Sequence, residues 1–81
     1  MEGGEERMIG IREGAPKISG FFGRGSFVTV AARIGNDLVG YVCDRDGNGL
    51  LLDVRDPSGD PHGYEFLPWS SIERVIVEEE G

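Results

Sequence analysis

The sequence predicts a small all-β protein in which five short strands curve into a strongly bent barrel. Three observations indicate this class: several short segments alternate apolar and polar residues, turn-forming residues separate those segments, and no long helical pattern occurs. The 14 glycines among 81 residues also favour many tight turns. A chain of this length forms one domain with a modest core.

The five strands are expected at residues 26–34, 38–43, 50–56, 64–69 and 73–79. One face of the first strand carries alternating apolar residues, namely Val28, Val30, Ala32 and Ile34. Residues 35–37 supply turn chemistry, and Gly40 inside the second strand indicates a bend or a close backbone approach. Pro68 ends or bends the fourth strand, which is therefore expected at a sheet edge. Residues 70–72 follow as a single helical turn.

The segments outside the strands divide the chain into three parts. Residues 1–25 are predicted to be a flexible or accessory N-terminal segment, residues 26–78 the barrel, and residues 79–81 an acidic tail. Residues 8–13 alternate well enough to form a short strand. The stretch from 20 to 27 contains three of the four phenylalanines and is expected to fold over one barrel mouth. It lacks the Lys-Ser/Thr pair of a phosphate-binding loop.

The charge distribution limits the classes of partner. Residues 1–35 carry five Lys/Arg against four Glu, whereas residues 36–81 carry three Arg against eleven Asp/Glu. Modules that bind duplex nucleic acid carry a basic footprint, so general nucleic-acid affinity is disfavoured. Basic residues remain in the N-terminal half, at Arg12, Lys17, Arg24 and Arg33.

Cysteine content and hydropathy bear on location. The single cysteine, Cys43, excludes an intrachain disulfide. No apolar run approaches the roughly 20 residues that cross a bilayer, and the N-terminus lacks a signal-peptide core. The prediction is a cytoplasmic protein with no membrane partner.

Residues 28–54 resemble the first signature of the Sm-like proteins. Alternating apolar residues lead to Gly35, Leu38 and Gly40 follow at the matching offsets, and Asp46 matches the aspartate of that family. Residues 64–77 resemble the second signature, which consists of a strand, a tight corner and a strand. The resemblance covers residues 26–78 and implies an Sm-like barrel, with the wider group of SH3-like barrels as the alternative.

The resemblance implies a non-enzymatic assembly module whose main partner is itself. In Sm-like proteins the fourth strand of one subunit pairs with the fifth strand of the next, and the head-to-tail contact closes a ring. The implied oligomer interface is Tyr64, Phe66, Arg74, Val75, Ile76 and Val77. The implied nucleic-acid or partner-binding residues, near the inner rim or supplying positive charge, are Arg45, Asp46, Asn48, Arg55, Pro68 and Trp69.

RNA is a further partner that the resemblance suggests, but the usual RNA-binding residues are not matched. Leu50 stands where uridine-binding members have asparagine, and Pro68 and Trp69 replace the arginine-glycine pair of the second signature. The alternative hypothesis is an SH3-like protein-interaction or structural module without nucleic-acid binding. The net charge of −8 over residues 36–81 favours this alternative.

Other motifs have simpler interpretations. Asp44, Asp46 and Asn48 have the spacing of a calcium loop, but Arg55 stands where a bidentate glutamate belongs, so a hairpin turn is predicted and no metal. Trp69 is either a stacking platform or a packed side chain, and packing is favoured. His62 lacks a converging nucleophile and acid–base set. We therefore predict no catalytic residue and no cofactor.

Overall fold

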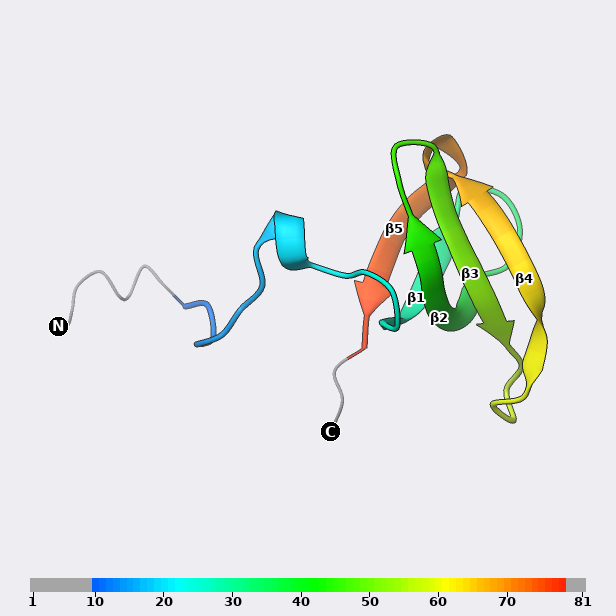
Figure 1. The fold of residues 1–81 in the computed structure, drawn as a ribbon, viewed down its shortest axis with the longest axis horizontal. Helices are drawn as coiled ribbons and strands as arrows, with labels where there is room; N and C mark the ends of the chain where they lie inside the picture. Colours follow the sequence, from blue (N-terminus) through cyan, green and yellow to red (C-terminus); the bar gives the residue numbers. More distant parts are fainter. Residues whose placement is uncertain (1–9, 79–81) are drawn as a thin grey trace, which may run out of the picture.

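The computed structural model describes residues 10–78, which form one antiparallel sheet of five strands in the order β4-β3-β2-β1-β5 (Figure 1). The strands are β1 (Phe27–Ala32), β2 (Leu38–Arg45), β3 (Gly49–Arg55), β4 (Pro61–Pro68) and β5 (Ile72–Val77). Two short 3-10 helices accompany them, η2 (Ile18–Gly20) before β1 and η3 (Trp69–Ser71) between β4 and β5. The prediction of a small all-β protein with five short strands is therefore confirmed.

The sheet bends so that its inner face encloses the core, while its two outermost strands stay unpaired with each other. Strands β1 to β4 form a meander, and β5 returns to pair with β1. Within residues 10–78 no ladder joins β4 to β5. The sheet is thus open rather than closed, and the barrel of the prediction is not confirmed.

The core lies on the inner face and is small. Its largest fully buried side chains come from the first three strands and are Val28, Val30, Val42, Leu50 and Leu52. Leu67 from β4 and Ile72 from β5 close it at the end that carries η3. In β5, Val75 and Val77 pack on this core while Ile76 is exposed, as alternation predicts.

The alternation predicted for the first strand holds for only half of its length. Val28 and Val30 are fully buried, but Ala31 is buried in place of Ala32, and Ile34 is 92% exposed. The ladder with β5 shifts register between Ala31 and Ala32, and a bulge of this kind turns the next side chain to the other face. The strand ends at Ala32, before Ile34.

Two other segments differ from the sequence prediction. Strand β4 begins at Pro61, although residues 61–63 were expected in a loop. Proline is tolerated there because β4 is an edge strand and the ladder with β3 is irregular between Val54 and Arg55. No strand forms at residues 10–13, and the rest of the expected N-terminal strand lies outside the described residues, as does the acidic tail at 79–81.

Gly40 explains how β2 bends. Its Cα faces the backbone of β3 so closely that an added Cβ would lie 2.2 Å from the carbonyl oxygen of Asp53. The close backbone approach predicted from the sequence is therefore confirmed. Gly35 has a φ of 100°, which explains why the β1–β2 turn needs glycine.

Candidate functional site

The structure gathers five of the six predicted binding residues at one end of the sheet. Arg45, Asp46 and Asn48 belong to the β2–β3 hairpin, and Pro68 and Trp69 lie beside it at the β4–η3 corner. The backbone N–H of Trp69 donates to the carbonyl of Asn48 at 3.4 Å, which joins the two segments. We call this group the hairpin rim.

The sixth residue, Arg55, lies at the opposite end of β3. Six residue steps separate it from the start of that strand at Gly49, which corresponds to about 20 Å of extended chain. Arg55 therefore belongs to a different surface from the hairpin rim.

The hairpin turn uses the side chain of Asp46 to hold its own backbone. Asp46 Oδ1 accepts hydrogen bonds from the backbone N–H of Asn48 at 2.8 Å and of Gly49 at 3.3 Å. This is the turn interpretation of the calcium-like motif. Gly47 and Gly49 are not among the glycines with positive φ, so the turn does not depend on a left-handed glycine. Over the described part of the chain, no group of three His, Cys, Asp or Glu side chains is placed to hold a metal ion.

Trp69 is half-buried, and two contacts fix its side chain. Its Nε1–H donates to the carbonyl of Asp46 at 2.6 Å, and its ring meets the Phe22 ring edge-on with centroids 6.5 Å apart. The guanidinium of Arg45 lies over the Phe22 ring, 4.8 Å from its centroid. Phe22 and Trp69 both pack against the core. This geometry supports packing rather than an open stacking platform.

Removing the indole N–H tests this assignment. We expect Trp69→Phe to lower the free energy of unfolding by about 1 kcal/mol, because the hydrogen bond to Asp46 is lost while the aromatic packing is kept. Urea denaturation measures the change. Tyr64→Phe, which removes only a hydroxyl group from a side chain that is 75% exposed, is the matched control and should change stability by less than about 0.5 kcal/mol. Equal stability of Trp69→Phe and the parent chain would contradict the assignment.

The six predicted interface residues occupy the two edge strands. Tyr64 and Phe66 lie on β4 and are 75% and 53% exposed, and Ile76 on β5 is 46% exposed. Arg74 is also exposed, whereas Val75 and Val77 are half-buried against the core. The structure thus brings these residues to the two edges of one sheet without bringing the edges together.

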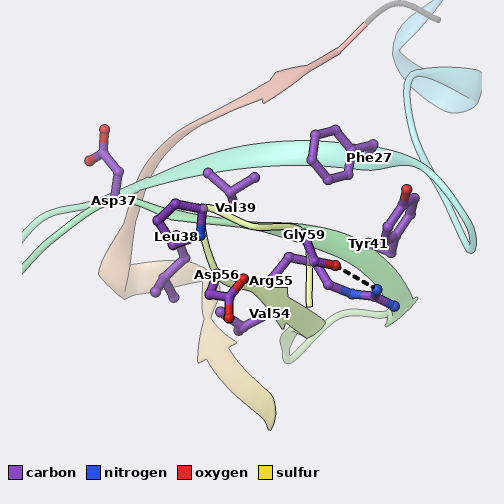
Figure 2. A pocket seen from close by; sticks show the side chains of 10 residues that line it. Phe27, Asp37, Leu38, Val39, Tyr41, Val54, Arg55, Asp56 and Gly59 are labelled. Carbon is purple, nitrogen blue, oxygen red and sulfur yellow. Dashed lines mark hydrogen bonds between the residues drawn. The ribbon is translucent and has the colours of Figure 1, made fainter. Parts of the chain in front are cut away.

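A groove that the sequence interpretation missed lies at the end of the sheet opposite the hairpin rim (Figure 2). It has a volume of about 550 Å³. Its apolar lining consists of Phe27, Leu38, Val39, Tyr41, Val54 and Pro57, and its polar lining includes Asp37, Arg55 and Asp56. Ligand sites in proteins have this size and this mainly apolar lining.

The groove opens where the β2–β3 ladder ends. The last paired residues there are Gly40 and Val54, so Leu38 and Val39 pair with β1 but have no partner in β3. Beyond Val54, β3 follows β4 instead, and the loop after it forms the facing wall. The sequence of this region shows only alternation and a loop with proline and glycine. The groove could not be read from it, because the opening depends on where the β2–β3 ladder ends relative to the β3–β4 ladder.

One wall of the groove belongs to a row of side chains that crosses four strands. Phe27 is paired with Tyr41, Tyr41 with Asp53, and Asp53 with Tyr64, and directly paired residues share a face. The Phe27 and Tyr41 rings are 4.9 Å apart. The sequence signal for this row is one aromatic residue in each of three strands, namely Phe27, Tyr41 and Tyr64.

Arg55 links β3 to the loop at Gly59, and its charge is paired with Asp53. Its Nη2 donates to Asp53 Oδ2 at 2.9 Å, its Nη1 donates to the Gly59 carbonyl at 3.2 Å, and its guanidinium lies 5.0 Å from the Tyr41 centroid. Figure 2 shows the bond that ties the loop at Gly59 to this side chain. The hydrogen bond with Asp53 raises the pKa of Arg55 above its ordinary value.

Comparisons with known proteins add no identification. Protein-family models, curated proteins and solved structures all give no match to this chain. Among the described residues, no helix is long and apolar enough to cross a membrane.

Proposed function

We propose that this chain is a non-enzymatic Sm-like assembly module that associates with copies of itself through its two edge strands. The observation that carries this proposal is the exposure of β4. All of its residues except Leu67 are exposed, including Tyr64 and Phe66, although the strand is eight residues long. Long exposed edges with apolar side chains pair readily with other strands, and stable monomers usually protect them.

The second edge supplies a complementary strand. β5 offers Ile76 on its exposed face, whereas Ile72, Val75 and Val77 belong to the core or pack against it. A β4-to-β5 contact joins two different surfaces, so it is heterologous and closes into a ring when the rotation permits. A domain this small gains stability from such association because its own core is limited.

RNA binding has less support than assembly. The net charge is −7, and Trp69 in the hairpin rim is already bonded to Asp46 and packed on Phe22. Counterion release from phosphates, which drives nucleic-acid affinity, requires a basic surface. The proposed module therefore acts mainly through protein contacts.

The alternative function is an SH3-like protein-interaction module without nucleic-acid binding. The groove beside Tyr41 favours it, because an apolar channel with an aromatic wall suits an extended peptide. This alternative needs no ring, so the oligomeric state separates the two functions.

Edge variants test the assembly proposal. The resemblance to ring-forming Sm-like proteins implies a parent-chain mass of about five to seven times 8.8 kDa by light scattering. Phe66→Glu on β4 and Ile76→Glu on β5 should each give a monomer at micromolar concentration, because a buried carboxylate at the contact is strongly unfavourable. An equimolar mixture of the two variants should form a dimer, since each variant retains one intact edge.

A control variant shows whether the edge strands alone hold the copies together. Ile11→Glu, at a residue that is 78% exposed and outside both edges, should leave the mass unchanged. An edge variant that still dimerises alone would indicate an isologous contact and contradict the head-to-tail arrangement. A parent chain that remains a monomer at all concentrations would remove the assembly function. Binding of uridine- or adenine-rich oligonucleotides at moderate salt would instead restore an RNA role.

A further inference from the structure

The segment before β1 projects from the domain and carries exposed apolar side chains. Figure 1 shows residues 10–20 running away from the sheet. Ile18 is 93% exposed there. The segment is attached to the domain at Phe22, which packs against the core beside Trp69. We call residues 10–21 the arm.

The middle of the arm has a defined local shape. A turn precedes it, in which the N–H of Ala15 donates to the carbonyl of Arg12 at 3.0 Å, and η2 begins at its last residue, Ile18. Pro16 restricts its own φ, and Lys17 is extended with φ −96° and ψ 163°. The result is a short projection, Pro16–Ile18, that presents one basic and one large apolar side chain.

The groove beside Tyr41 complements this projection. Its lining is mainly apolar, and it carries two carboxylates, Asp37 and Asp56, besides Arg55. The Arg55 charge is matched by its ion pair with Asp53, so the two remaining carboxylates leave the groove acidic. The Asp56 carboxylate is held in place because it accepts the backbone N–H of Ser58 and of Asp60, each at 2.9 Å. A basic and apolar segment therefore fits in both charge and hydropathy.

The arm does not lie near the groove of its own chain. Phe22 is stacked with Arg45 at the hairpin rim, whereas the groove lies at the other end of β2 and β3. The arm, drawn in blue to cyan, extends away from the sheet (Figure 1). A neighbouring copy is the occupant that satisfies the geometry of both surfaces.

We propose that Pro16–Ile18 of one copy docks in the groove of a second copy, with Ile18 against the aromatic wall and Lys17 beside the carboxylates. This contact deepens the self-association proposed above and rests on it, because it needs a second copy. So short a segment binds weakly alone. It gains strength when edge pairing already holds the copies together, because the local concentration of the arm then rises.

Mixed-label NMR at millimolar concentration tests the contact. In an equimolar mixture of isotope-labelled and unlabelled full-length chain, we expect filtered intermolecular signals between the Ile18 methyl groups and the Tyr41 ring. Lys17→Glu and Asp37→Lys should each reduce these signals about twofold or more through lost charge attraction. A chain that carries both changes should regain them, which a purely structural role of either residue would not produce.

A pair of matched arm variants provides the control. If the contact forms, the NMR chemical shifts of the Tyr41 ring should change on dilution. This change should vanish in Ile18→Asp and persist in Ile11→Asp, since both isoleucines are exposed but only Ile18 is in the projection. Absence of intermolecular Ile18–Tyr41 signals in the parent chain would overturn the proposal. Phe66→Glu separates it from edge pairing: its mass should fall while a weaker Ile18–Tyr41 signal remains at millimolar concentration.

Discussion

Gly40→Ala should lower the free energy of unfolding by about 3 kcal/mol or more, enough to unfold much of the population of a marginally stable domain. The new Cβ would lie 2.2 Å from the carbonyl oxygen and 2.9 Å from the carbonyl carbon of Asp53. These are backbone atoms in a ladder, so they cannot rotate away as a side chain would. Gly40 is also paired with Val28 on its other side, which prevents β2 from retreating.

The matched control is another glycine of the same hairpin. Gly47 has no atom within 4 Å of an added Cβ and is not among the positive-φ glycines, so Gly47→Ala should change stability by less than about 1 kcal/mol. Urea denaturation of both variants and the parent gives the comparison. Similar stabilities for the two alanine variants would show that β2 and β3 are not as close at Gly40 as the structure has them.

The groove also depends on this glycine. The β2–β3 ladder ends at the Gly40–Val54 pair, and the groove opens directly beyond it. A variant that pushed β3 away from β2 would therefore widen the groove as well as weaken the core. Gly40, which by itself indicated only a bend or a close approach, thus also bears on the shape of the groove.

Local features of the fold were predictable from the sequence because they depend on neighbouring residues. Alternation placed Val28 and Val30 in the core, and the turn residues placed Gly35 between two strands. The helical turn expected at residues 70–72 also forms, one residue earlier, as η3 (Trp69–Ser71). In each case the determining interaction lies within a few residues of the chain.

Features that depend on strand register could not be predicted in the same way. The bulge at Ala31 and Ala32 arises from pairing with β5, about 40 residues later in the chain, and it reverses the expected burial of the two alanines. The early start of β4 likewise depends on how Pro61 meets β3. Alternation of apolar and polar residues indicates that a strand exists, but it does not show where the pairing register with the neighbouring strand changes.

The candidate site shows the same division. Five of the predicted binding residues lie together because they belong to two local motifs, the β2–β3 hairpin and the β4–η3 corner, which one backbone hydrogen bond joins. Arg55 was grouped with them only through its charge, and the direction of β3 places it at the other end of the sheet. Phe22 was expected over a barrel mouth, but its contact with Trp69 joins positions 47 residues apart and has no sequence signal.

Leu52→Ala should cost about 2–5 kcal/mol of unfolding free energy, because it removes a fully buried side chain from a core with few large members. The cavity would lie at the centre of the sheet, where Val42 faces Leu52 across the β2–β3 ladder. Leu51→Ala is the matched control. Leu51 points to the outer face and is only half-buried, so its loss should cost less than half as much. Comparable losses would contradict the assigned faces.

The size of this loss also bears on assembly, because a domain with so small a core has little stability to spare. If copies associate through β4 and β5, the association stabilises the native state, and the Tm of the parent chain must rise with protein concentration. The same rise should be absent in Phe66→Glu, which has lost the β4 contact. Leu52→Ala should retain it, since its defect lies inside one copy and both edges remain intact. If the Tm of the parent chain rises with concentration but the Tm of Leu52→Ala does not, the core and the edge strands do not act separately.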